Sequence, residues 1–203
     1  MTEKEKTWDR LLQIHTVGRD DVMADEYHHP YEPTPYSVLE RLASSGLIGP
    51  EDVVLDYGCG KGRVDFFLSH QLKSKTIGIE YDERMYHGAL ENQHSAVSAA
   101  EFVLARAEAY KIPASVNRCY FFNPFSVEIL HKVMARILES YYADPREMFL
   151  FFYYPSDEYV AYLMTVDALE FYDEVECDDL FAGKDPRERI LIFSLPDYEE
   201  LEV

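Results

Sequence analysis

The chain has 203 residues, which suits a single domain with one sizeable core, and its 47% hydrophobic content is that of a folded globular protein. Its formal net charge is −19, and residues 167–203 contain thirteen acidic side chains against three basic ones. An acidic surface repels phosphate backbones, so the composition disfavours nucleic acid as a partner.

Two helices are predicted before the first strand. Residues 5–16 place apolar side chains at helical spacing, which predicts an amphipathic helix. A second helix is expected to begin with Thr34 as its N-cap and Pro35 as its first residue, and to stop at Gly46. Residues 1–46 are therefore expected to form a helical cap and an entrance loop in front of a main domain, residues 47–203.

Five short β-rich segments follow, and each precedes a stretch with a helical pattern. The predicted strands are 53–56, 76–80, 101–105, 119–123 and 148–154, and the predicted helices are 62–72, 83–97, 107–112, 126–141 and 157–166. Successive βα units imply a parallel sheet with helices on both faces. Two further strand-like runs, 168–180 and 187–196, have no helix between them, so at least one is expected to be antiparallel. The predicted fold is α/β, a doubly wound, seven-stranded, mostly parallel sheet with an N-terminal helical cap.

The stretch "VVLDYGCGKGR" (53–63) places three glycines at alternate positions directly after the first predicted strand. A strand, a glycine turn and a helix form a binding site for an adenosine-containing cofactor at the carboxyl end of the strand. A dinucleotide-binding turn has glycines at the first, third and sixth positions, but the sixth position counted from Gly58 is Arg63. Here the glycines stand first, third and fifth, and Asp56 precedes them by two residues.

This pattern resembles the first motif of class I S-adenosylmethionine-dependent methyltransferases, an acidic residue followed by G-x-G-x-G. The resemblance implies that S-adenosylmethionine is the cofactor and that Asp56 helps to hold its amino group. It also implies that the turn wraps the methionine and ribose part, through Tyr57, Gly58, Cys59, Gly60 and Gly62.

Two later segments resemble the next motifs of this family. Glu80 ends the second predicted strand twenty residues after Gly60, where a carboxylate accepts the ribose hydroxyls, and Tyr81 is placed to lie against the adenine. The segment "RAEAYKIP" (106–113) resembles the adenine-edge loop, but an arginine stands where the usual acid lies. Either Glu108 or backbone groups near Ala107 are expected to contact the adenine instead.

The segment "YFFNPFS" (120–126) resembles a shortened form of the N-P-P-[YF] motif of methyltransferases that act on planar amines. Carbonyl oxygens of Asn123 and Pro124 would accept the amine hydrogens, and Phe125 would stack on the acceptor. One proline is missing, which leaves the register of the aromatic ring open. A simple Asn-Pro turn at the strand end is the alternative interpretation.

Several tyrosines are expected near the acceptor. Tyr154 ends the fifth predicted strand, and Tyr27, Tyr31 and Tyr36 lie on the entrance loop, a segment that the family often uses to cover the cofactor and shape the substrate pocket. The expected function is methyl transfer from S-adenosylmethionine to an unidentified acceptor, an amine on a small molecule or a protein. An NAD(P)-binding oxidoreductase and a non-catalytic methyltransferase-like interaction module remain alternatives, as do sulfur and oxygen nucleophiles.

The sequence also bears on compartment and metal binding. No apolar run reaches the roughly 20 residues of a membrane-spanning helix, and residues 1–10 lack the apolar segment of a signal peptide. The three cysteines are far apart, and His28–His29 has no supporting third ligand. We therefore expect a cytoplasmic protein without a metal site or membrane contact. The oligomeric state is not defined by the sequence.

Overall fold

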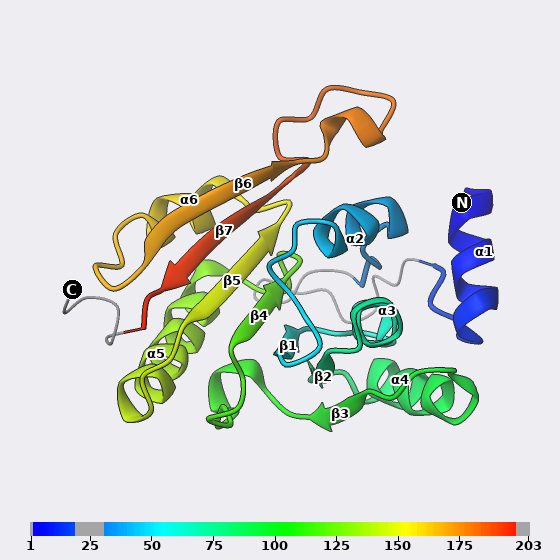
Figure 1. Ribbon diagram of the computed structural model, residues 1–203, viewed down its shortest axis with the longest axis horizontal. Helices are drawn as coiled ribbons and strands as arrows, with labels where there is room; N and C mark the ends of the chain where they lie inside the picture. Colours follow the sequence, from blue (N-terminus) through cyan, green and yellow to red (C-terminus); the bar gives the residue numbers. More distant parts are fainter. Residues whose placement is uncertain (1, 19–30, 198–203) are drawn as a thin grey trace.

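A computed structural model of the chain describes residues 2–18 and 31–197, and these residues build a seven-stranded sheet between two layers of helices (Figure 1). The strands lie in the order β3-β2-β1-β4-β5-β7-β6. Their bounds are β1 Val53–Tyr57, β2 Lys75–Glu80, β3 Glu101–Leu104, β4 Arg118–Phe121, β5 Met148–Tyr153, β6 Glu170–Glu176 and β7 Arg189–Leu195.

The sheet is parallel from β3 to β5, and β7 is antiparallel to both of its neighbours. The predicted mostly parallel sheet with an antiparallel closing strand is therefore confirmed. Because parallel strands end at the same edge of a sheet, the carboxyl ends of β1, β2 and β4 meet there. This edge carries the residues that the sequence singles out.

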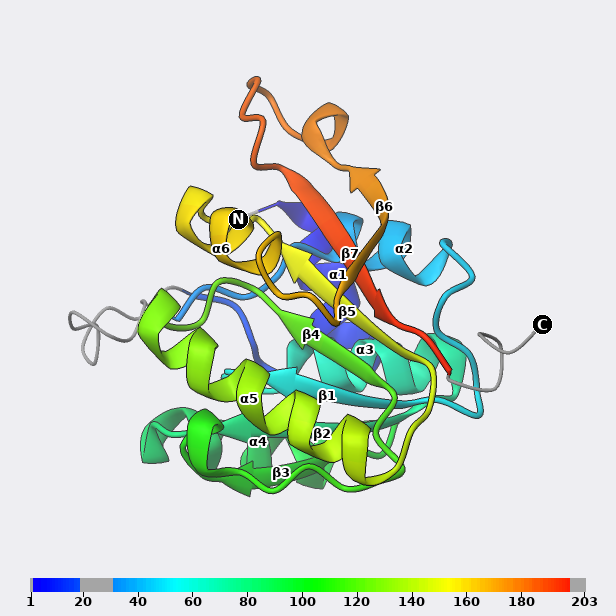
Figure 2. The same ribbon diagram turned by 90° about the vertical axis from the view of Figure 1, so that its left-hand side faces the viewer.

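The helices are α1 Glu3–Leu12, α2 Tyr36–Ala43, α3 Arg63–Leu72, α4 Glu83–Ser95, α5 Val127–Ala143 and α6 Asp157–Leu163. Buried residues of α1, α2 and α3 share one core, whereas α5 and α6 pack into a second core on the other face of the sheet (Figure 2). Within the described residues, no helix is long and apolar enough to cross a membrane.

Several predicted helix bounds differ from the structure. The first helix, expected over 5–16, is Glu3–Leu12. The expected helix over 107–112 is a single 3₁₀ turn, η1 Ala107–Ala109. Helix α2 begins at Tyr36 with Pro35 as its N-cap, and Thr34 makes no cap. The Thr34 hydroxyl lies 3.0 Å from the Tyr120 hydroxyl instead, because a buried tyrosine oxygen needs a hydrogen-bond partner.

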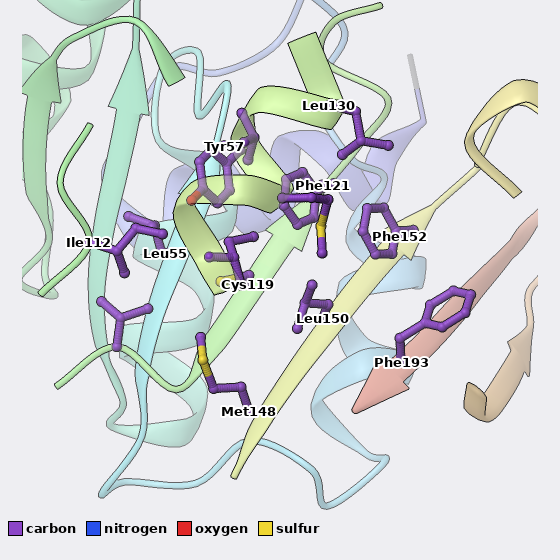
Figure 3. Packing of buried hydrophobic residues seen from close by; sticks show 14 of the residues in the cluster. Leu55, Tyr57, Ile112, Cys119, Phe121, Leu130, Met148, Leu150, Phe152 and Phe193 are labelled. Carbon is purple, nitrogen blue, oxygen red and sulfur yellow. The ribbon is translucent and has the colours of Figure 1, made fainter. Parts of the chain in front are cut away.

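An aromatic stack joins the carboxyl ends of three strands under α5 (Figure 3). The ring of Phe121, on β4, stacks on Tyr57 from β1 at 4.6 Å and on Phe152 from β5 at 4.5 Å, measured between centroids. All three side chains are at most 1% exposed. Offset aromatic pairs contribute about 0.5–1.5 kcal/mol beyond their burial, so the stack fixes the strand ends that frame the site.

Candidate cofactor and acceptor site

The glycine turn connects β1 to α3 and is tied to the neighbouring strand β2. The backbone N–H groups of Gly58 and Cys59 donate to the Ile79 carbonyl, at 2.9 and 3.0 Å. Gly58, Gly60 and Gly62 have φ values of +76°, +56° and +82°, in the left-handed region that L-residues rarely adopt. The backbone conformation of the turn is therefore by itself a sufficient reason for glycine at these three positions.

The glycines also make room for other parts of the chain. A Cβ on Gly58 would lie 2.7 Å from Cβ of Pro124, and a Cβ on Gly60 would overlap the ring of Tyr31. The sequence predicts that Gly60 lets a ligand approach the backbone, but the structure places the Tyr31 ring there. Tyr31 and Pro124 both line the pocket, so the two glycines leave space for side chains that form its wall.

Glu80 braces the turn from the end of β2. Its Oε2 accepts from the N–H of Gly60 at 2.9 Å, and its Oε1 accepts from the N–H groups of Tyr81 and Asp82 at 2.8 and 2.9 Å. Burial raises the pKa of Glu80, and these N–H donors oppose the rise. The carboxylate therefore has a fixed orientation on the pocket wall.

A pocket opens beside the glycine turn and gathers most of the predicted site residues. Those on its wall are Tyr31, Asp56, Gly58, Cys59, Glu80, Tyr81, Ala107, Glu108, Pro124 and Phe125. The motifs assigned separately from the sequence thus meet at one place. Glu108 lies 3.6 Å from the guanidinium of Arg106, the residue that stands where the family usually has an acid.

The Asn-Pro-Phe segment turns sharply after β4. Asn123 has φ +43°, in the left-handed region that asparagine tolerates better than most residues, and it does not line the pocket. Pro124 and Phe125 do line it. Phe125 is only 4% exposed, and its carbonyl accepts the hydroxyl hydrogen of Tyr159 at 2.6 Å.

Arg63 is a site residue whose role was not predicted, because the sequence used it only to exclude a dinucleotide pattern. Its guanidinium is 3% exposed and borders the pocket. Nε donates to the Thr16 hydroxyl at 2.7 Å, and Nη1 donates to the Glu5 carboxylate and to the Thr34 carbonyl. The sequence does contain one signal for such a cation. Glu5 and Asp9 are four residues apart on the first predicted helix, so both acids lie on the same helix face and can pair with one basic side chain.

Tyr36 is not an acceptor-binding residue, and that prediction is corrected. Its ring is fully buried, 4.4 Å from the Arg63 guanidinium, and its hydroxyl donates to Oδ1 of Asp9 at 2.6 Å. The side chain therefore joins α1, α2 and α3. The sequence could not distinguish this role, because a loop tyrosine next to a helix start suits a pocket and a core equally.

Three more predicted positions face elsewhere. Tyr57 points into the aromatic stack because successive residues of a strand face opposite sides, and Asp56 already faces the pocket. Tyr154 lies outside the pocket, where its hydroxyl donates to Asp185 at 2.6 Å and Arg187 covers its ring. Gly62 also lies off the wall, against Phe102. Tyr27 and His28–His29 fall outside the described residues.

A known protein family matches the part of the chain that contains these motifs. Residues 54–143, from β1 to the end of α5, match the sequence profile of a family described as "Methyltransferase domain". Over these residues the chain is similar to methyltransferase domains. The match includes the glycine turn, Glu80 and the Asn-Pro-Phe segment.

Two curated proteins and one solved structure illustrate the similarity. A protein-lysine N-methyltransferase of Saccharolobus islandicus (strain REY15A) is 33% identical over 66 residues, 32% of this chain and 41% of that protein. A histone-lysine N-methyltransferase of Dictyostelium discoideum, H3 lysine-79 specific, is 38% identical over 63 residues, 31% of this chain and 3% of that protein. The aligned part is thus less than half of either relative.

The solved structure is an RNA methyltransferase from Salinibacter ruber in complex with S-adenosyl-L-homocysteine. It superposes with a TM-score of 0.55 at 17% identity, covering 81% of this chain and 94% of that one. At this identity the similarity establishes the methyltransferase fold alone.

Proposed function

We propose that this chain is an S-adenosylmethionine-dependent methyltransferase whose acceptor is an amine, with a lysine side chain of a protein as the best-supported class. The observation that carries the proposal is the meeting of the predicted motifs at one pocket, with Asp56 and Gly58, Glu80, and Pro124 and Phe125 on its wall. Convergence of residues far apart in the sequence on one concave site is typical of a binding site.

The wall residues fit the cofactor. Oδ2 of Asp56 is buried, and no hydrogen-bond donor from the described residues reaches it, which leaves it available to the cofactor's amino group. Glu80 stands at the strand end suited to the ribose hydroxyls, and Tyr81, Ala107 and Glu108 border the region suited to the adenine. When bound, S-adenosylmethionine supplies an electrophilic methyl group on its sulfonium.

The chain's own part in the reaction is to position the acceptor and exclude water. Pro124 lines the pocket and Asn123 directly precedes it, and in this proposal their carbonyl oxygens accept the amine hydrogens, so that the nitrogen lone pair points toward the methyl group. Phe125 adds an aromatic face for the positive charge that the nitrogen acquires. A lysine ammonium group must first lose one proton to solvent, because only the neutral amine has a lone pair for the attack. The methylated product is again an ammonium ion, so the proposal assigns no general base to the chain.

Charge supports a cationic acceptor. The net charge of −19 attracts basic protein segments and repels phosphate backbones. Glu32 is on the pocket wall, and Glu188 lies near it. Burial is the main cause that raises the pKa of Glu188, and the neighbouring Asp185 and Glu32 charges raise it further. Both curated relatives carry lysine methyltransferase names, which agrees with this choice.

Calorimetric titration tests the cofactor. We expect saturable binding of S-adenosylhomocysteine at one site and no heat from NAD. Binding of NAD without binding of S-adenosylhomocysteine would replace this proposal by the oxidoreductase alternative.

Methyl transfer from labelled cofactor tests the acceptor. The protein is incubated separately with acid-extracted basic proteins, with total RNA and with a small-molecule extract, and the labelled product is identified by mass spectrometry. We expect methylated lysine in the protein fraction. Label confined to RNA contradicts the acceptor class, and cofactor binding without transfer to any fraction supports a non-catalytic module.

A further inference from the structure

Two buried carboxyl groups contact each other behind the pocket. Asp56, on β1, is 3% exposed and lines the pocket, and Asp65, in the first turn of α3, is fully buried behind it. Their side chains interact directly, but no donor from the described part of the chain reaches Oδ2 of Asp56 or either oxygen of Asp65. Two carboxyl groups in contact without a donor are compatible with burial only if at least one is protonated.

No cation from the described residues neutralises the pair. The groups that face it are Cys59 from the glycine turn, Glu80 from β2 and Tyr120 from β4. Burial raises the pKa of the Cys59 thiol and of the Tyr120 hydroxyl, so both stay neutral. Arg63, the nearby cation of α3, is bonded to Glu5 and Thr16 instead.

The depth of burial assigns the proton, because Asp65 is fully buried, whereas Asp56 borders the pocket where a cationic ligand can stabilise its charge. Burial raises the pKa of Asp56 to about 7, and the hydrogen bond with Asp65 lowers it. Burial also raises the pKa of Asp65 well above its usual range, and the neighbouring Asp56 charge and the same hydrogen bond raise it further. Asp65 is therefore the protonated donor and Asp56 is the acceptor, and Asp56 is the member of the pair that lines the pocket.

We propose that Asp65 is a positioning residue for the cofactor: it stays protonated and holds the Asp56 carboxylate for the α-ammonium group of S-adenosylmethionine or S-adenosylhomocysteine. Below neutral pH the Asp56 O–H bond breaks on binding, its proton leaves to solvent, and ammonium N–H groups take its place. Asp65 keeps its own proton throughout. This inference rests on the proposed cofactor, and it predicts that cofactor affinity depends on pH.

The test measures binding, not turnover. The affinity of the full chain for S-adenosylhomocysteine is titrated from about pH 5.5 to about pH 8.5, beside 5′-methylthioadenosine, a thioether nucleoside that lacks the amino-acid part. We expect affinity for S-adenosylhomocysteine to rise about tenfold per pH unit and level off near neutral pH, as for release of one proton. Affinity for 5′-methylthioadenosine should not change with pH, because it has no ammonium group.

Two substitutions identify Asp65 as the cause. Asp65→Asn keeps a donor for Asp56 and should reproduce the wild-type pH profile. Asp65→Leu removes the donor, so it should weaken S-adenosylhomocysteine binding about tenfold or more at neutral pH and move the plateau to higher pH, with 5′-methylthioadenosine affinity unchanged. Glu83→Gln, an exposed acid at the start of α4, serves as the control.

Three results would overturn the inference. They are a flat wild-type profile for S-adenosylhomocysteine, the same pH dependence for both ligands, and a wild-type profile in Asp65→Leu. The first two need no variant, so they hold even if Asp65→Leu does not fold. A flat profile leaves the proposed function intact, whereas failure of the wild-type chain to bind either ligand overturns both.

Discussion

The ring of Tyr31 packs against Gly60 so closely that a Cβ at residue 60 would overlap it. The Tyr31 hydroxyl donates to the Thr16 carbonyl at 2.7 Å, and Nζ of Lys61 lies 5.5 Å from the ring centroid. One side chain therefore connects the segment after α1 to the glycine turn. Gly60 therefore lacks a side chain because the Tyr31 ring packs against its backbone at the edge of the pocket.

Gly60→Ala should weaken cofactor binding by displacing Tyr31 from the pocket wall. Alanine at this φ costs about 1–2 kcal/mol of backbone energy, and the overlap with the ring adds to it. We expect affinity for S-adenosylhomocysteine to fall about tenfold or more, measured by calorimetry. Gly46→Ala is the matched control, because Gly46 has φ +77° with no neighbour within 4 Å. An equal loss in both variants would mean that backbone strain, not Tyr31, is responsible.

Replacing Asn123 should lower turnover and spare cofactor binding. Loss of a positioning contact typically costs about a hundredfold in rate, whereas the cofactor contacts lie on other residues. Because Asn123 has φ +43°, Asn123→Gly removes the side chain without the strain that alanine adds. We expect Asn123→Ala and Asn123→Gly both to keep S-adenosylhomocysteine affinity within about threefold and to lose about a hundredfold in kcat. Full turnover in Asn123→Gly would mean that the Asn-Pro-Phe segment is only a turn and does not position the acceptor.

Arg63→Met should destabilise the fold strongly, because it leaves the Glu5 and Asp9 carboxylates without their buried cation. Removing one partner of a buried ion pair costs about 3–5 kcal/mol, and urea unfolding measures the change. Arg136→Met, which breaks an exposed pair with Glu139, should cost no more than about 0.5 kcal/mol.

A compensating variant tests the cause of that loss. Adding Glu5→Gln and Asp9→Asn to Arg63→Met removes the stranded charges and should restore part of the stability. No recovery would mean that Arg63 acts through packing on Tyr36 and its hydrogen bonds with Thr16 and Thr34 rather than through charge.

The fold could be predicted because its signals are local. Each strand from β1 to β5 is a short apolar run followed by a helical pattern, and the handedness of βα units leaves few arrangements for such a chain. The helix after β3 was overpredicted because "RAEAYKIP" has helical composition but ends in a proline, which allows only one 3₁₀ turn. The sequence shows no helical pattern between β6 and β7, which was sufficient to predict an antiparallel closing strand; the structure has only the single 3₁₀ turn η2 Asp178–Leu180 there.

The site was most predictable at strand ends and in the short segments that follow them, such as Glu108 and Pro124. The alternation of a strand and the glycine spacing place Asp56, Gly58 and Glu80 without knowledge of the loops. Tyr31, Tyr36 and Tyr154 depend on which loop packs against which helix, and neither propensity nor spacing reports that. Arg63 and Asp65 follow the glycine turn in a helix, where their burial depends on α1 and on Asp56 respectively.

The buried acid pair should also make stability depend on pH, and Asp65→Asn should remove the part of that dependence that comes from Asp65. In the folded protein the pKa of Asp65 is raised well above its usual range, so the folded chain keeps a proton that the unfolded chain loses above about pH 4. Its stabilising contribution is complete below that pH and is lost progressively as pH rises. An asparagine donates to Asp56 without needing a proton, so the variant avoids this cost.

We therefore expect Asp65→Asn and wild type to have similar free energies of unfolding near about pH 4.5, and the variant to be more stable by about 2 kcal/mol or more near about pH 8. Urea unfolding at the two pH values measures the difference. Glu91→Gln, an exposed position on α4, removes one negative charge without touching the pair and should shift both values equally. If Asp65→Asn and Glu91→Gln change with pH in the same way, the effect belongs to the net charge of −19, because general repulsion and not the Asp56–Asp65 contact would then set the slope.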